Sequence, residues 1–173
     1  FIAGPKKPKE TLRFYSFEHE NLAYTSIKIS QKNFLFGSGV KTFFNECNRL
    51  KKETTILDTI NKRGNKLLCS THPHSTYFQL LSDIGIFGFL LGLFFLCYVI
   101  LTYFKIIFRA KKITSNYLSY YFINLGLLIN LFPLIPSGSI FNNWISLIIF
   151  YLFGFWLFLK NKLDIKKPQN SLA

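Results

Sequence analysis

The stretch STHPHSTYFQLLSDIGIFG, residues 70–88, divides the chain into two unlike halves. The sequence before it is polar and basic, and the sequence after it is strongly apolar. The stretch also contains His72 and His74, two of the three histidines of the protein. We therefore expect a polar site that lies against a membrane surface.

The charges are distributed as in a membrane protein. A formal net charge of +13 raises the question of nucleic-acid binding. However, thirteen of the 21 basic residues lie before Asp83, mixed with most of the acidic residues. The others form two patches that follow apolar runs: Lys105, Arg109, Lys111 and Lys112, and Lys160, Lys162, Lys166 and Lys167. This is the positive-inside pattern, so no nucleic-acid partner is expected.

Three membrane spans are predicted in the apolar half. Residues 84–104 carry no charge, and these 21 residues are enough for one crossing. Residues 113–159 are 47 residues without a charge, which suits two spans joined by a turn. Proline, glycine and asparagine mark that turn at residues 133–143. The second and third spans are then expected at about 117–135 and 144–159, and the last is short for a full crossing.

Fold class and topology follow from these spans. We predict an all-α, polytopic helical membrane protein. The positive-inside rule places both basic patches in the cytoplasm. Residues 1–83 then form a large periplasmic loop, and residues 84–173 form three transmembrane helices with a cytoplasmic tail. Long loops translocate largely regardless of their charge, so the basic residues of the loop do not change this assignment.

Two helices are expected within the loop, at residues 19–32 and 41–48. Apolar residues recur at roughly helical spacing in the first: Leu22, Ala23, Ile27 and Ile29. Residues 51–66 are polar and are predicted to be irregular, with a turn near residues 63–65.

Cys47 and Cys69 flank this polar segment and are candidates for a disulfide. Such a bond forms in an oxidising compartment and contributes roughly 2–4 kcal/mol. Two free thiols are the alternative. No metal site is predicted, because the chain has no Cys-x-x-Cys and one cysteine with two histidines gives too few ligands for zinc.

The two neighbouring histidines are candidates for acid–base chemistry. Pro73 suits the first position of a helix, which would place His72 near the cap and His74 in the first turn. A helix N-terminus favours a bound phosphate or diphosphate and disfavours a protonated imidazole. A neutral His74 beside an anion site fits a general base that activates a hydroxyl. The alternative is that both histidines only cap a helix at the membrane interface.

Several segments resemble the O-antigen ligase and polymerase family. Residues 74–85 look like its His-(Asn/Ser/Gln)-x9-Gly signature, and CSTHPHSTY at residues 69–77 resembles its THPHNxY form. NFLFGSGV at residues 33–40 resembles its NPxxGxG turn. PSGSIFNNW at residues 136–144 is similar to its P-x-G-x-x-F-N-N-W segment. His19 stands where members often have arginine.

The resemblance implies a glycosyltransferase of the bacterial inner membrane. Its members move a glycan from a polyprenyl diphosphate to the hydroxyl of a lipid or glycan acceptor, without a metal or other cofactor. It implies that His74 is catalytic and that the chain is the C-terminal portion of a larger fold. The residues expected to bind the substrate are Arg13, His19, His72, Ser75 and Tyr77.

A polytopic transporter of a small anion is the alternative function. It predicts ionisable residues inside the spans, along the path of the anion. Between residues 84 and 159 the charges are confined to residues 105–112, at one predicted end, which counts against transport.

Overall fold

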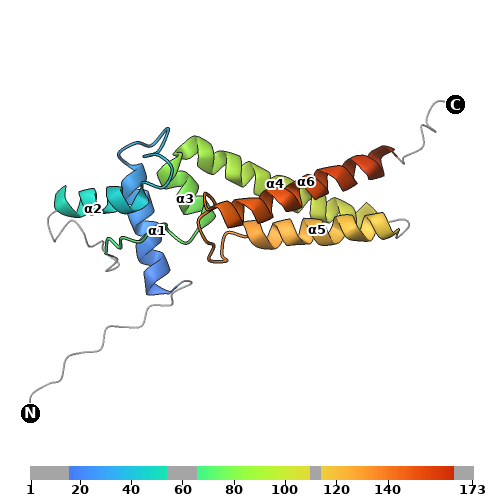
Figure 1. The fold of residues 1–173 in the computed structure, drawn as a ribbon, viewed down its shortest axis with the longest axis horizontal. Helices are drawn as coiled ribbons and strands as arrows, with labels where there is room; N and C mark the ends of the chain where they lie inside the picture. The colour runs from blue at the N-terminus through green and yellow to red at the C-terminus, as the bar shows by residue number, and fades with distance from the viewer. Residues whose placement is uncertain (1–15, 54–65, 110–113, 166–173) are drawn as a thin grey trace, which may run out of the picture.

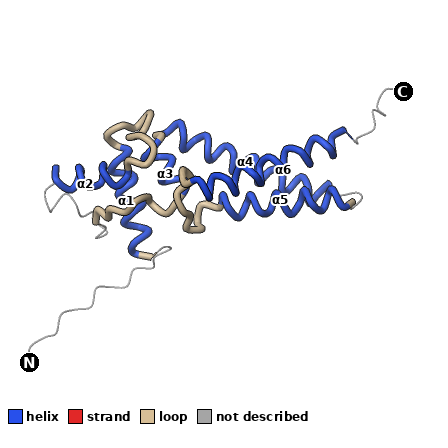
Figure 2. Tube along the Cα trace, viewed as in Figure 1, coloured by secondary structure: helices blue, strands red, loops and turns tan. Residues whose placement is uncertain are grey.

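The computed structural model describes residues 16–53, 66–109 and 114–165, and it is helical with no strand in these ranges. The helices are α1 (Phe17–Ser30), α2 (Phe43–Glu53), α3 (Thr76–Asp83), α4 (Ile86–Arg109), α5 (Ser115–Leu131) and α6 (Asn143–Ile165). α4, α5 and α6 lie along the long axis of the molecule, and α1, α2 and α3 gather at one end of them (Figure 1). Loops surround α3 at this junction (Figure 2). The all-α prediction is confirmed.

α4 and α6 are long and apolar enough to cross a membrane. The qualifying segments are Ile86–Phe108 and Asn143–Leu163. α6 continues well past the predicted end at residue 159. The helix does not stop where the charges begin, because lysine is a good helix former. The Lys160 ammonium lies over the ring of Trp156, 5.6 Å from its centroid. The aliphatic stem of such a lysine covers apolar surface while its charge remains at the edge.

α5 is shorter than predicted. It has 17 residues and ends at Leu131, whereas the predicted span continued to residue 135. Pro133 explains the difference, because the residue before a proline avoids helical backbone and Phe132 is extended (φ −67°, ψ 124°). Two helices of the described part, rather than the three predicted, therefore reach the length of a membrane span.

α4, α5 and α6 share an aromatic core. Trp156 is completely buried and stacks on Tyr120 from α5, with ring centroids 6.0 Å apart. Tyr98 from α4 meets the same indole edge-on at 5.5 Å. One α6 side chain therefore contacts both other long helices.

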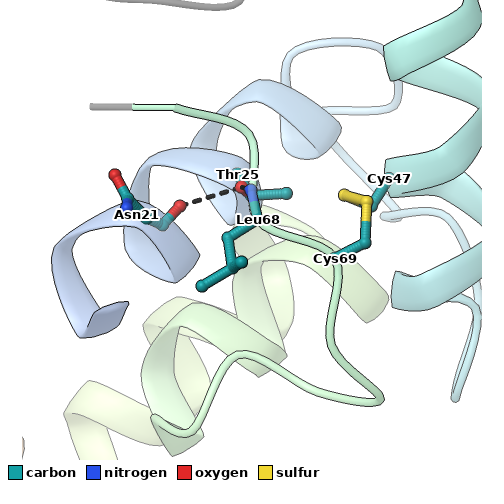
Figure 3. The surroundings of a disulfide bond; sticks show 5 residues. All are labelled: Asn21, Thr25, Cys47, Leu68 and Cys69. Atoms are coloured by element: carbon teal, nitrogen blue, oxygen red, sulfur yellow. Dashed lines mark hydrogen bonds between the residues drawn. A yellow bond between two sulfur atoms is a disulfide. The ribbon is translucent and has the colours of Figure 1, made fainter. Parts of the chain in front are cut away.

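α1 and α2 form a second, smaller core with the segment that precedes α3. Its buried residues are Leu22, Ile29, Phe43, Cys47, Leu50 and Leu67. The helix predicted at residues 19–32 is confirmed as α1, but the expected apolar face is not, because most of its buried residues are polar and Ile27 is 42% exposed. Thr25 can be buried because both its hydrogen-bonding needs are met: its hydroxyl donates to the Asn21 carbonyl and accepts the Leu68 N–H (Figure 3).

α2 extends five residues beyond the predicted end at residue 48, so the irregular segment was predicted to begin too early. Arg49 pairs with Glu46 and Glu53, one turn before and after it on the helix. Leu50, the next residue, is buried. The turn predicted near residues 63–65 lies outside the described residues.

Candidate functional site

The segment that leads to the histidines is fastened on two sides. Cys69 forms a disulfide with Cys47 of α2, with an S–S distance of 1.98 Å (Figure 3). One residue earlier, the Leu68 N–H donates to the Thr25 hydroxyl of α1 at 3.0 Å. The Lys66 N–H donates to the Asn21 side chain at 2.9 Å. The chain therefore enters the histidine turn from a fixed point.

His74 lies in a turn before α3, not in its first helical turn. Its φ of 53° is left-handed, a conformation that non-glycine residues seldom adopt and that cannot continue a right-handed helix. The backbone returns to the extended region at Ser75, the N-cap, and α3 begins at Thr76. The prediction that the helix starts at Pro73 is therefore wrong.

Three histidines meet at this turn. The rings of His72 and His74 have centroids 4.1 Å apart, and the ring of His19 from α1 lies 6.1 Å from that of His74. No group of three or more His, Cys, Asp or Glu in the described part of the chain is arranged to hold a metal ion. Arg13, which is also expected to bind the substrate, lies outside the described residues.

A hollow of about 130 Å³ opens beside His74. Its lining includes His19 and Glu20 from α1, His74 and Ser75 from the turn, and Pro133 and Pro136 from the α5–α6 loop. The Ser75 side chain does not cap α3, so it leaves the N–H groups of the first helical turn uncapped. Such groups favour a bound anion.

The pKa of His72 lies below its ordinary value. Its Nδ1 lies 3.0 Å from the Thr71 hydroxyl, and its Nε2 is buried with no hydrogen-bond partner among the described residues. Burial lowers the pKa of His72, and a proton on the neighbouring His74 would lower it further. His72 therefore resists protonation beside His74.

Tyr77 points away from the hollow, although the resemblance implied that it binds the substrate. Its hydroxyl donates to the carbonyl of Leu131 at 2.6 Å, and only 5% of its surface is exposed. Burial raises the pKa of Tyr77 to about 12. The side chain joins α3 to the C-terminal end of α5, so it positions the helix that carries the histidine turn.

Gln79, which was not predicted from the sequence, joins α3 to the α5–α6 loop. Its amide nitrogen donates to the Ser139 hydroxyl at 2.8 Å, and its amide oxygen accepts the Ile140 N–H at 3.0 Å. Thr76, three residues earlier on the helix, lies 3.0 Å from the Ser137 hydroxyl. The signal was present, because a glutamine one turn after a threonine marks a polar face on a short helix.

Asp83 closes the other end of α3. Its carboxylate accepts the Lys41 N–H at 3.2 Å and the Ser82 hydroxyl at 3.2 Å. Burial raises the pKa of Asp83, and these hydrogen bonds oppose that rise. The carboxyl orients backbone from the α1–α2 loop.

Residues 33–40 form a clamp on the junction between α3 and α4. The N–H groups of Ser38 and Gly39 donate to the carbonyls of Ser82 and Asp83, each at 2.9 Å. A Cβ on Gly37 would lie 2.4 Å from the Asp83 carbonyl carbon. On the other side, a Cβ on Gly85 would lie 2.5 Å from the carbonyl oxygen of Leu35. Both glycines have positive φ, so this contact needs glycine twice.

The segments that carry the resemblance therefore meet in space. Residues 33–40 hold one end of α3, residues 69–77 form its other end, and residues 136–144 hydrogen-bond along its side. No protein-family model matches the chain, and no curated protein or solved structure matches it either.

Proposed function

We propose that the protein is a glycosyltransferase of the O-antigen ligase and polymerase type. It moves a glycan from a polyprenyl diphosphate to an acceptor hydroxyl at the periplasmic face of the bacterial inner membrane. One observation carries the proposal: three segments far apart in sequence converge on α3, and they leave His74 displayed beside a hollow at the end of two membrane-length helices.

The arrangement of the molecule supports this topology. The C-terminal ends of α4 and α6 lie at the end of the helices that is far from α3 (Figure 1). Lys160 and Lys162 of α6 lie near that end, and such residues favour the cytoplasm. The Cys47–Cys69 disulfide belongs on the oxidising, periplasmic side. The histidine turn then faces the periplasm at the membrane edge.

In the proposed reaction His74 acts as the general base. It takes the proton of the acceptor hydroxyl while that oxygen attacks the anomeric carbon, and the bond from this carbon to the diphosphate breaks. The diphosphate leaves with the electron pair of that bond. The N–H groups at the start of α3, with His19 and Arg13, stabilise its negative charge. His72 stays neutral and limits the positive charge next to the base.

The test compares two substitutions of His74 in a cell that depends on the protein for surface glycan. His74→Ala removes the imidazole, and His74→Asn removes it with a residue that tolerates the left-handed backbone. We expect both variants to lose glycan transfer at least 100-fold with normal membrane levels, because general-base catalysis contributes about that much. Phe44→Ala, at an exposed position of α2 that does not line the hollow, serves as the control and should keep normal transfer.

Normal transfer by His74→Asn would exclude the proposed role of His74. A defect in His74→Ala that His74→Asn restores would show that the position needs its backbone conformation rather than its imidazole.

A further inference from the structure

The loop between α1 and α2 holds large apolar side chains outward. Phe34, Leu35 and Val40 are each a little over half exposed, and Phe36 is 77% exposed. Exposed apolar groups of this kind mark an interaction surface when they are contiguous. The three consecutive residues Phe34, Leu35 and Phe36 are called the apolar tip below.

The backbone of the apolar tip is fixed. The Gly37 N–H donates to the Asn33 carbonyl at 2.8 Å and closes the turn behind the tip. The Ile86 N–H donates to the Phe34 carbonyl at 2.8 Å and ties the tip to α4. Gly37 is also in close backbone contact with Asp83. These bonds hold the backbone of the tip in place, so the segment cannot turn to bring its side chains into the core.

The apolar tip lies at the height where α4 begins. The ring centroids of Phe36 and Phe87 are 5.8 Å apart, and Phe87 belongs to the first turn of the membrane-length segment. The outer face of α4 continues from Phe87 with Leu91 and Phe94, which are 70% and 69% exposed. The loop lies beside the start of α4 in Figure 1. Tip and helix therefore form one continuous apolar surface.

We propose that the apolar tip inserts into the boundary between headgroups and acyl chains of the bilayer that α4 crosses. Aromatic side chains favour this depth. Lys41, shortly after the tip, is exposed and carries the charge that anionic headgroups attract, whereas Lys32 before the tip is paired with Glu53. The partner is thus the lipid surface itself. The inference rests on the membrane placement of α4 in the proposed function and not on glycosyl transfer.

Insertion of the tip sets the position of the histidine turn. The clamp that carries the tip bonds the last two residues of α3, Ser82 and Asp83. His74 precedes the other end of this eight-residue helix, about 12 Å away at 1.5 Å per residue. Insertion of the tip into the bilayer would therefore hold His74 at a fixed distance from the tip, equal to the length of α3.

The test uses nitroxide labels on single cysteines in the full chain, reconstituted in vesicles of phosphatidylethanolamine and phosphatidylglycerol. Cys97→Ala supplies the background, because Cys47 and Cys69 are already joined. Labels at Leu35→Cys and Phe36→Cys report the tip, and Leu91→Cys reports the α4 face. Phe44→Cys, on α2 and 48% exposed, is the matched control outside the tip.

Collision rates with oxygen, which concentrates in lipid, are compared with those of a water-soluble nickel complex. For labels at the tip and at Leu91 we expect the collision rate with oxygen to exceed that with the nickel complex several-fold. For the label at Phe44 we expect the opposite order. Nickel access at the tip equal to that at Phe44 would overturn the proposal. Exclusion of both reagents would also overturn it, since it would show a protein partner or a second copy on the tip.

The same measurement on His74→Asn separates this inference from the reaction. The tip labels should report the same depth in that variant. If the protein were not a glycosyltransferase, the expected result for the tip would be unchanged. If the label at Leu91 were accessible to water, α4 would not cross the bilayer and the inference would be overturned.

Discussion

The backbone N–H of Ser137 donates a hydrogen bond to the carbonyl oxygen of His74, with an N–O distance of 3.0 Å. The donor belongs to the α5–α6 loop, and the acceptor belongs to the turn before α3. The hydroxyls of Thr76 and Ser137, also 3.0 Å apart, add a second link beside the first. The conformation of the histidine turn therefore depends on the assembled long helices.

A double-mutant cycle on Thr76→Val and Ser137→Ala tests this link. We expect a coupling energy of about 0.5–1.5 kcal/mol, the usual net contribution of one hydrogen bond. The free energies of unfolding are measured by denaturant titration in detergent micelles. Pairing Thr76→Val with Ser119→Ala, at an exposed position of α5, should give additive effects. Additive effects for Thr76 and Ser137 would contradict the link.

Alanine at Gly37 or Gly85 should prevent the clamp from seating on the α3–α4 junction. Each added Cβ would meet backbone atoms at 2.4–2.5 Å, and positive φ adds further strain. We expect little folded protein in membranes, measured by expression and gel filtration. Gly154→Ala is the matched control, because its Cβ would have no neighbour within 4 Å. Well-folded Gly37→Ala protein would show that the junction opens easily.

Removal of the disulfide with Cys47→Ser and Cys69→Ser should lower the free energy of unfolding by about 3 kcal/mol, as expected for a loop of this size. Thermal unfolding with and without reducing agent measures the loss. Cys97→Ser, at the free cysteine, should unfold as the parent does in either condition. A reducing agent that leaves the parent unchanged would show that the bond does not stabilise the fold.

The stability of the protein should fall as the pH is lowered through about 6.5, in part because of His72. Burial, together with the nearby imidazole of His74, holds the pKa of His72 below its ordinary value of 6.5. Between the lowered pKa and 6.5 the unfolded chain binds more protons than the folded one, so the free energy of unfolding falls as the pH falls.

The midpoint of thermal unfolding, measured from pH 7.5 to 5.0, checks this expectation for the parent and for His72→Gln. The variant should lose less stability over the acidic part of this range. Parallel curves for the two proteins would show that His72 titrates as it does in the unfolded chain.

The sequence predicted the helical class because uncharged apolar runs and helical spacing are read directly from residue order. It located the ends of helices less well, for reasons that lie in contacts. Pro133 ended α5 earlier than the apolar run did, and α6 continued through Lys160, whose ammonium lies over the Trp156 ring. Side-chain packing of this kind is not visible in a local pattern.

The candidate site was partly predictable. His19, His72, His74 and Ser75 were predicted to act together, and the structure places them at one turn or its neighbouring hollow. The left-handed backbone of His74 was not predictable, because it is imposed by the fixed segment before it and by the bond from the α5–α6 loop. The polar contacts of Gln79 were missed because its partners lie on another part of the chain.

The bond between Cys47 and Cys69 also has a consequence for the order of biogenesis. Its second cysteine is only three residues from His72, so oxidation fastens the chain immediately before the turn that displays His74. A newly made chain that has not yet met an oxidant lacks this fastening. In the proposed topology, export is therefore also a maturation step, because the chain before the histidines is fastened only on the side of the membrane where the proposed substrate is presented.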